Sequence, residues 1–225
     1  MSANTRETNI DIWESIYKTN QNILGYPDDV LIRVGHHTLK NGECRAVLDY
    51  GFGTGSNLIH FIDRGFEVSG VEVSESAIRY LQARLVERGS EADLRSVKEG
   101  KLPFENQRFD AVVAWQVLYY NTWQTLSDAI REIERVLRPG GIFIGTMAAP
   151  GDFSHINSVP KGDSTYESIV PNQLGATILI VEKEQLARCF PDRELDIGSF
   201  GFEFGTRVSR HWIVTYRKPE YEALP

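Results

Sequence analysis

A glycine-rich turn between an apolar segment and a helical pattern restricts the fold of this chain more than any other feature. The segment Ala46–Tyr50 is mostly apolar, and Gly51, Gly53 and Gly55 follow at alternate positions before the helical pattern of 57–62. This order predicts a strand, a tight turn and a helix. Glycine lets the backbone turn sharply and lets a ligand lie against it without obstruction by Cβ atoms. The turn therefore predicts a nucleotide-type cofactor site at the carboxyl end of a first strand.

A second strand is predicted over 66–72, and it ends in an acid, Glu72. Ser74 is a suitable N-cap for a helix that continues to residue 88. A carboxylate at this place can accept hydrogen bonds from both hydroxyls of a ribose. We therefore predict that Glu72 binds a ribose, and the alternative is that it ends a strand in solvent.

The spacing of the three glycines separates two kinds of cofactor. A dinucleotide site uses Gly-x-Gly-x-x-Gly, whereas this chain has Gly-x-Gly-x-Gly followed by Ser56. The segment 48–55 instead resembles the first motif of class I S-adenosylmethionine-dependent methyltransferases. In that family the turn runs beneath the methionine and ribose of a cofactor without phosphate. The resemblance implies S-adenosylmethionine and disfavours an NAD-dependent oxidoreductase.

The resemblance continues along the chain. The segment 102–113 resembles the family's approach to its fourth strand, and 131–144 resembles the helix, turn and fifth strand that follow. The helix is expected to end at Arg138, because Pro139 cannot continue it. These matches cover about residues 40–147, and the last third of the chain matches only in layout.

The resemblance implies an α/β fold of the Rossmann-like, doubly wound type. Its sheet has seven mostly parallel strands, the last of them antiparallel. We expect one methyltransferase domain over 1–225, with N-terminal helices at about 10–40 and frayed residues before them. A helix is predicted over 182–189, and two closing strands over 194–204 and 207–218.

The resemblance also implies a set of cofactor-binding residues. The three glycines line the methionine, Glu72 holds the ribose and Asp49 buttresses the turn or contacts the cofactor amine. The full set is Tyr17, Asp49, Gly51, Gly53, Gly55, Glu72, Val73, Glu99, Gly100, Lys101, Trp115 and Gln116.

Five of these residues are placed by their position within the motifs. Glu99 lies near the family's acidic position for the adenine amino group, but its spacing is one residue short, so Gly100 or Lys101 is an alternative. Trp115 and Gln116 are expected to flank the methionine. Separately, Trp13 and Tyr17 share one helix face, where they either close the site or pack in the core.

The segment 148–175 is rich in Pro, Gly, Ser and Asn and has weak periodicity. A connection this long is a lid, a binding loop or a disordered segment. It leaves the fifth strand at the edge that carries the glycine turn, and its apolar side chains favour a substrate-covering lid.

Methyl transfer to an oxygen or nitrogen calls for a base. Of the five histidines, His155 is the one in the expected lid, so it is our first candidate. The alternative is that His155 hydrogen-bonds its own loop. Tyr120, after the fourth strand, is the second candidate. We expect surface or packing roles for His36, His37 and His60 and a strand-edge role for His211.

Composition limits the partners of the chain. A net charge of −7 without a basic run disfavours nucleic acid as a partner. The sequence has no long apolar run of the kind that would predict a signal peptide or a membrane span. Its two cysteines form no motif, which suits reduced thiols in the cytoplasm. No metal is expected.

We predict methyl transfer to a small polar molecule, with a sugar or sugar nucleotide as first candidate. The alternative is a non-catalytic cofactor-binding module, such as a sensor.

Overall fold

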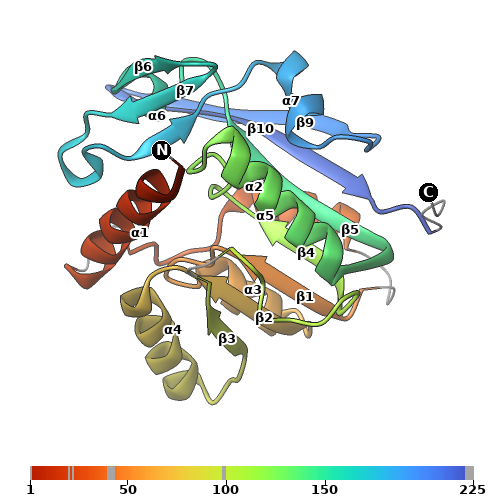
Figure 1. The fold of residues 1–225 in the computed structure, drawn as a ribbon. Coiled ribbons are helices and arrows are strands. Elements are labelled where there is room, and N and C mark those ends of the chain that lie inside the picture. The colour runs from red at the N-terminus through yellow and green to blue at the C-terminus, as the bar shows by residue number, and fades with distance from the viewer. Residues whose placement is uncertain (1, 20, 22, 40–43, 98–99, 221–225) are drawn as a thin grey trace.

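A seven-stranded sheet organises the molecule (Figure 1). The structure is a computed structural model that describes residues 2–19, 21, 23–39, 44–97 and 100–220. The strand order is β3-β2-β1-β4-β5-β10-β9. In chain order the strands are β1 (Ala46–Tyr50), β2 (Glu67–Glu72), β3 (Asp93–Ser96), β4 (Phe109–Ala114), β5 (Leu137–Ala148), β9 (Asp196–Phe204) and β10 (Arg207–Arg217). Strands β1 to β5 are parallel, and β10 runs antiparallel to both β5 and β9. The predicted Rossmann-like α/β fold with an antiparallel last strand is confirmed.

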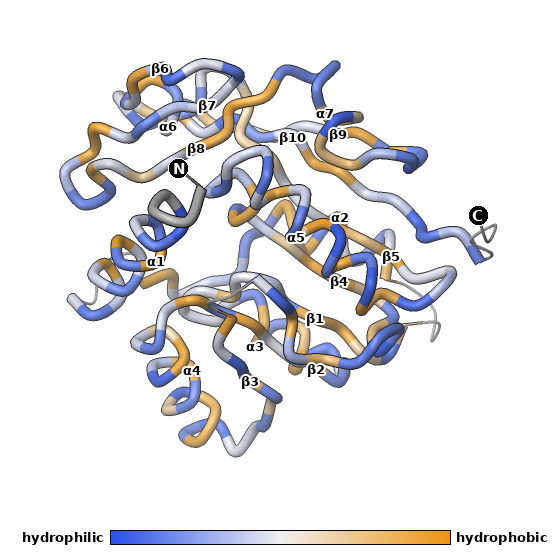
Figure 2. The backbone as a smooth tube through the Cα atoms, in the orientation of Figure 1, coloured by the Kyte–Doolittle hydropathy of each residue, from blue (hydrophilic) through white to orange (hydrophobic). Residues whose placement is uncertain are grey.

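Helices cover both faces of this sheet. One face carries α2 (Asp29–Thr38), α3 (Ser56–Asp63) and α4 (Glu75–Arg88), and the other carries α5 (Trp123–Val136) and the short α7 (Leu186–Cys189). Successive side chains of a strand point to opposite faces, so Val47 packs in the first of these cores and Leu48 in the second. Figure 2 shows the resulting concentration of apolar residues along β1 and β4. With both faces covered by helices, the carboxyl ends of the parallel strands meet at one edge of the sheet.

The first helix, α1 (Ser2–Lys18), lies across that edge (Figure 1). We expected the N-terminal helices to begin at about residue 10, with frayed residues before them, but the helix already begins at Ser2. The sequence over residues 2–9 has few apolar residues, so its pattern does not reveal these early turns. Contacts with distant parts of the chain hold them instead, and these are described with the site below.

The segment after β5 has more regular structure than its sequence predicts. It contains α6 (Phe153–Ile156), β6 (Ser158–Gly162), β7 (Thr165–Ser168) and a 3₁₀ turn, η1 (Pro171–Gln173). With β8 (Thr177–Leu179), the two strands form a small antiparallel sheet of order β6-β7-β8. The strands are too short for a clear alternating pattern, so the sequence resembled a loop. This small sheet lies beside α1 (Figure 1).

Two helix ends differ from the sequence predictions. Helix α5 ends at Val136 and not at Arg138, because a proline disfavours helical geometry in the preceding residue and Leu137 is already extended. The helix predicted over 182–189 is divided into a 3₁₀ turn, η2 (Lys183–Gln185), and α7. Across the described part of the chain, every helix is too short or too polar to span a membrane.

Candidate cofactor site

The glycine turn after β1 has the backbone geometry that its sequence predicts. The φ angles of Gly51, Gly53 and Gly55 are +74°, +55° and +79°, a region that favours glycine. A Cβ on Gly51 would collide with Val117, and one on Gly53 would lie 2.7 Å from the Tyr17 hydroxyl. The turn is therefore packed closely on the side facing α1 and the loop after β4.

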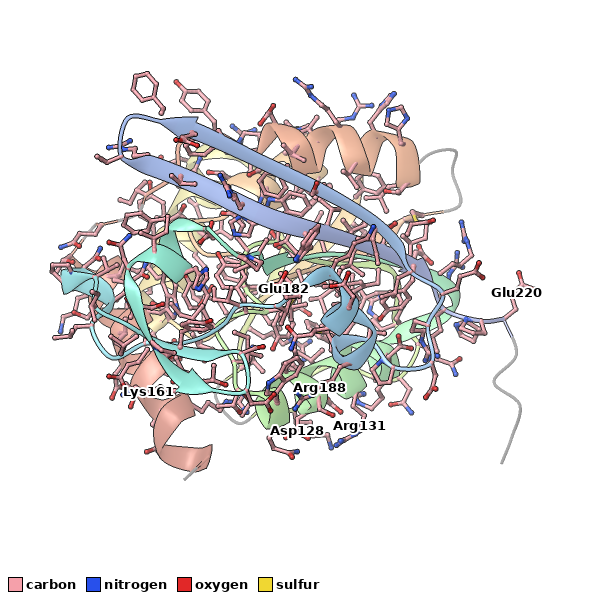
Figure 3. The ribbon with its side chains drawn as sticks, turned by 90° about the horizontal axis from the view of Figure 1, so that it is seen from above. Asp128, Arg131, Lys161, Glu182, Arg188 and Glu220 are labelled. Atoms are coloured by element: carbon pink, nitrogen blue, oxygen red, sulfur yellow. The ribbon has the colours of Figure 1, made fainter. Side chains whose placement is uncertain are left out.

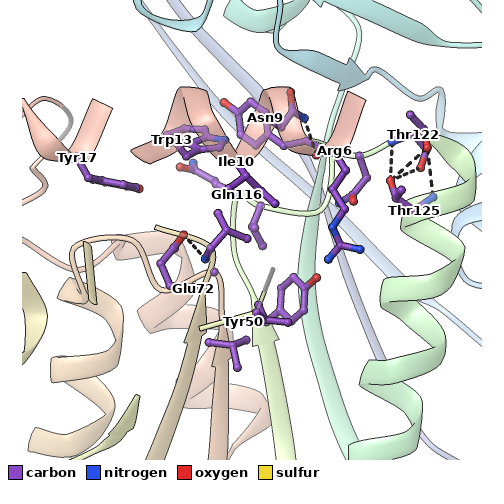
Figure 4. A pocket seen from close by; sticks show the side chains of 17 residues that line it. Arg6, Asn9, Ile10, Trp13, Tyr17, Tyr50, Glu72, Gln116, Thr122 and Thr125 are labelled. Atoms are coloured by element: carbon purple, nitrogen blue, oxygen red, sulfur yellow. Dashed lines mark hydrogen bonds between the residues drawn. The ribbon is translucent and has the colours of Figure 1, made fainter. Parts of the chain in front are cut away.

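A pocket opens above this turn, between α1 and the ends of β1, β2 and β4 (Figure 4). The space in it that water-sized molecules can occupy is about 110 Å³, and the pocket is open at its mouth. Its lining is Arg6, Asn9, Ile10, Trp13, Tyr17, Tyr50, Gly51, Val71, Glu72, Val73, Val97, Gln116, Val117, Tyr120, Asn121, Thr122 and Thr125.

Glu72 lies in the pocket wall with 6% of its surface exposed. Its Oε2 accepts a hydrogen bond from the Gly53 N–H at 2.9 Å, and its Oε1 accepts from Val73 and Ser74 at 2.7 and 3.1 Å. Burial raises the pKa of Glu72, and the three backbone donors oppose that rise. A carboxylate has about four acceptor directions, so about one remains on Oε2 for a ligand hydroxyl. The expected pair of ribose bonds is thus reduced to one in this side-chain position.

Asp49 is a second buried acid at the end of β1. It is 2% exposed, and its Oδ2 atom has no hydrogen-bond partner. Burial, and then the neighbouring charge of Glu72, raise the pKa of Asp49 to about 7. Two adjacent buried carboxylates favour a proton or a cationic ligand nearby. The site is therefore electrostatically suited to a positively charged molecule.

Hydrogen bonds from two residues hold helix α1 over the pocket. Asn9 donates to the carbonyls of Tyr120 and Thr177 at 2.9 and 3.1 Å and accepts from the Thr177 N–H at 2.9 Å. Glu14 accepts from the hydroxyls of Ser74 and Ser76 at 2.6 and 2.7 Å. Burial alone would raise the pKa of Glu14, but the hydrogen bonds from Ser74 and Ser76 bring it down to about 2. The helix thereby closes the pocket that the strand ends open.

The structure brings about half of the predicted site residues to the pocket wall. These are Tyr17, Gly51, Glu72, Val73, Gln116 and Tyr120. Asp49 directly precedes Tyr50 of the wall in β1, Gly53 lies against the Tyr17 hydroxyl, and Gly100 lies against the guanidinium of Arg6.

Other predicted residues lie away from the pocket. Gly55 packs against Leu81 of α4, and Lys101 is exposed. The Trp115 ring stacks on Phe200, with centroids 5.4 Å apart, and packs in the core between the sheet and α2, α3 and α4. Glu99 falls outside the described residues.

His155, the histidine of the expected lid, also lies away from the pocket wall. The Nδ1 atom of His155 accepts from the Gly151 N–H at 2.9 Å, and its ring packs edge-on against Tyr166. His155 is not among the lining residues.

Sequence reasoning missed several residues of the wall. On α1 these are Arg6, Asn9 and Ile10, and after β4 they are Val117, Thr122 and Thr125. Arg6, Ile10, Trp13 and Tyr17 are spaced by four, three and four residues, which places them on one helix face. That spacing was available in the sequence, but the polar residues between them concealed it.

Comparison with known proteins supports the expected family. Residues 47–141, from β1 into β5, match the sequence model of a methyltransferase domain. This match, and a relative named as a methyltransferase, support the expected resemblance to the class I S-adenosylmethionine-dependent methyltransferases. The matched range contains the glycine turn, Glu72 and the loop after β4, and therefore most of the pocket wall outside α1.

Individual relatives differ in what they act on. The chain is 32% identical over 121 residues to malonyl-[acyl-carrier protein] O-methyltransferase of Pseudescherichia vulneris, covering 52% of this chain and 45% of that one. It is 30% identical over 105 residues to dTDP-3-amino-3,4,6-trideoxy-alpha-D-glucopyranose N,N-dimethyltransferase of Streptomyces venezuelae, covering 45% and 42%. The chain spans about half the length of the curated relatives it matches.

A solved structure confirms the fold over nearly the whole chain. It is 1,6-didemethyltoxoflavin-N1-methyltransferase of Burkholderia thailandensis, with bound 1,6-didemethyltoxoflavin and S-adenosylhomocysteine. The TM-score is 0.76 at 18% identity, with 97% of this chain and 91% of that chain covered. The similarity extends beyond the family match to α1 and the closing strands.

Proposed function

We propose that this protein binds S-adenosylmethionine in the pocket beneath α1 and transfers its methyl group to an oxygen or nitrogen of a small polar molecule. The observation that carries the proposal is the pair of buried acids, Asp49 and Glu72, beside a pocket whose floor is the glycine turn. When bound, S-adenosylmethionine supplies an electrophilic methyl group on a positively charged sulfur. The pocket residues orient the reactants and exclude water.

The residues present fit this cofactor. The remaining acceptor direction on Glu72 Oε2 suits a ribose hydroxyl, and the unpartnered Oδ2 of Asp49 suits the cofactor's positive charge. Val73 and Val97 offer apolar wall for an adenine, and the Trp13 and Tyr17 rings on α1 cover the pocket.

For the acceptor, we propose a sugar or sugar nucleotide. The support is the 30% identity to an amino-sugar N,N-dimethyltransferase. We further propose that α6 and the small sheet cover the acceptor, since Asn9 of the pocket wall hydrogen-bonds Thr177 of β8. Tyr120 of the same wall hydrogen-bonds Ser154 and Gln173 in this segment.

The test is an assay with methyl-labelled S-adenosylmethionine and thymidine diphosphate-linked sugars and amino sugars. We expect S-adenosylhomocysteine to form only with an acceptor, and mass spectrometry to detect one added methyl group. Tight cofactor binding without transfer to any acceptor would favour a non-catalytic binding module. Failure of calorimetry to detect cofactor binding would overturn the proposal.

The glycine turn allows a test of the cofactor position. Gly53→Ala places a methyl group 2.7 Å from the Tyr17 hydroxyl, and we expect the dissociation constant of S-adenosylmethionine to rise about tenfold or more as Tyr17 is displaced. Gly89→Ala is the matched control, because Gly89 has a φ of +62° and open space around its missing Cβ. Calorimetry measures both. Normal binding by Gly53→Ala would show that the turn is structural only.

The two candidate bases are separable by substitution. Tyr120 lines the pocket, whereas the Nδ1 of His155 is hydrogen-bonded to Gly151. We therefore propose Tyr120 as the base, and expect Tyr120→Phe to lower turnover about 100-fold, the usual effect of losing a positioned base. His155→Ala is expected to change turnover by less than about threefold. The reverse order of effects in a steady-state assay would assign the base to His155.

A further inference from the structure

Three buried titratable side chains and the half-buried Tyr120 form a row behind the acceptor end of the pocket. They are Asp152 before α6, His211 on β10, and Tyr119 and Tyr120 after β4. Asp152, His211 and Tyr119 are 3%, 4% and 5% exposed. None of these three lines the cofactor pocket. Because burying such groups is costly without a partner, their arrangement calls for an explanation.

The contacts in the row run from one residue to the next. The Nε2 of His211 lies 3.4 Å from the Tyr119 hydroxyl, and its Nδ1 lies 3.8 Å from Asp152 Oδ2 and 3.2 Å from the Ser209 hydroxyl. The Tyr119 and Tyr120 ring centroids are 4.5 Å apart, and the Tyr119 hydroxyl donates a hydrogen bond to the Tyr120 oxygen. A phenol hydroxyl can both donate and accept, so this bond can reverse. Tyr120 ends the row at the pocket wall.

Backbone donors fix the acid at the other end. Asp152 Oδ1 accepts from the Ser154 N–H at 2.8 Å, and Oδ2 accepts from the Arg210 N–H at 2.9 Å. A negative charge near Nδ1 favours the histidine tautomer with its proton on that atom. Nε2 is then an acceptor that faces the Tyr119 hydroxyl.

The protonation states leave His211 able to accept a proton. Burial lowers the pKa of His211, against the opposing charges of Asp152 and Asp28, so the ring is neutral at pH 7. Burial raises the pKa of Tyr119 well above its usual value, and that of Tyr120 to about 12. Both phenols therefore hold protons, and a neutral imidazole stands ready to receive one.

His211 also borders a second hollow, on the far side of the row from the cofactor pocket. This hollow is lined by His211, Phe200, Trp212, Arg210 and Glu182, among others. Figure 3 shows Glu182 near the strand β10. Phe200 stacks flat on the His211 ring, with centroids 5.2 Å apart. The row thus connects the pocket to a separate surface depression that carries charged groups.

We propose that Tyr120, Tyr119 and His211 form a proton relay, stabilised by Asp152, that removes the proton of the methyl acceptor. The inference rests on the proposed function, since it requires an acceptor with an O–H or N–H bond. The acceptor's electron pair forms the new bond to carbon, and its proton passes to the Tyr120 oxygen. The Tyr120 proton passes to Tyr119, and the Tyr119 proton passes to His211 Nε2. The imidazolium faces Asp152 and releases its proton at the second hollow.

Nuclear magnetic resonance of histidine-labelled protein tests the resting state without an acceptor. We expect neutral His211 to carry its proton on Nδ1, seen in the ¹⁵N shifts, and Asp152→Asn to lower its pKa further. Arg210 and Glu182 in the hollow and Asp28 before α2 are unchanged in this variant. A neutral His211 protonated on Nε2, or a pKa insensitive to Asp152, would overturn the relay.

Kinetics with any acceptor from the sugar panel test the relay in action. We expect His211→Gln and Tyr119→Phe to lower kcat about tenfold to 100-fold with little change in KM, because they act through Tyr120. The wild-type rate should fall at acid pH as His211 charges, and His211→Gln should abolish this fall. His37→Gln, at an exposed histidine of α2, is the control and should retain both rate and profile.

Failure of the relay is distinguishable from failure of the proposed function. A His211→Gln enzyme that methylates at the wild-type rate, with the same pH profile, would overturn the relay and leave the methyltransferase assignment intact. If the wild-type protein does not bind S-adenosylmethionine, the proposed function is wrong. The resonance experiment would still test the arrangement of the relay.

Discussion

Glu72→Gln is expected to raise the dissociation constant for S-adenosylmethionine about 30-fold or more, a loss of about 2 kcal/mol or more in binding free energy. The glutamine lacks the charge that strengthens a hydrogen bond to the ribose. It also turns an amide N–H₂ toward backbone N–H groups, either that of Gly53 or those of Val73 and Ser74. The substitution thereby disturbs the turn that forms the floor of the pocket.

Glu67→Gln is the matched control for this experiment. Glu67 stands at the opposite end of β2, where its carboxylate is half exposed and pairs with Arg108 at 3.0 Å. We expect it to bind the cofactor within about twofold of the wild type, because exposed ion pairs contribute little. If calorimetry finds equal affinities for the wild type and Glu72→Gln, Glu72 does not hold the ribose.

Asp49→Asn is expected to stabilise the ligand-free protein at high pH. The folded-state pKa of Asp49 is about 7, against an ordinary value of 3.8. The folded state therefore binds the proton more tightly than the unfolded state, so this group stabilises the fold below pH 4 and the effect is lost as pH rises toward 7. The full difference is about 4 kcal/mol at pH 8. Asparagine cannot ionise and avoids that loss.

Urea unfolding at pH 5 and pH 8 measures the effect. The advantage of Asp49→Asn over the wild type should grow between the two values. The exposed Asp63→Asn serves as control, since it changes only a surface ion pair with Arg88. An advantage of Asp49→Asn that is independent of pH would contradict the raised pKa.

The same acid links cofactor binding to proton release. A positively charged cofactor near Asp49 lowers its pKa, so binding at pH 7 should release about half a proton from the wild type. Calorimetry in two buffers of different ionisation enthalpy measures this release. Asp49→Asn should bind more weakly and release none, although its ligand-free form is more stable.

The sheet and the glycine turn were predictable because each depends on local pattern. Apolar runs defined β1, β2 and β4, and the positive φ angles of the turn follow from its glycines. The position of Glu72 at the pocket wall was predictable for the same reason, because it is the last residue of β2 and parallel strands end at one edge of the sheet. Its three backbone donors were not, because they come from the folded turn and from the start of α4.

Contacts between distant segments could not be predicted from the sequence. The early turns of α1 depend on Asn9, whose partners Tyr120 and Thr177 are more than 100 residues away. Trp115 was expected at the cofactor, but the direction of its side chain depends on its packing with Phe200 of β9. His211 was given a strand-edge role, and only the pairing of β10 with β5 brings it to Tyr119.

The interior position of β10 has a consequence for biosynthesis. Between Ile142 and Ala148, β5 pairs on one side with a strand that comes last of the seven in the chain. While the ribosome is still making residues 149–217, that edge of β5 has no strand to accept or donate its hydrogen bonds. An unpaired apolar edge attracts other strands, including those of neighbouring nascent chains. We therefore expect ribosome-bound chains that end before β10 to aggregate or recruit chaperones, and chains that include it to remain separate.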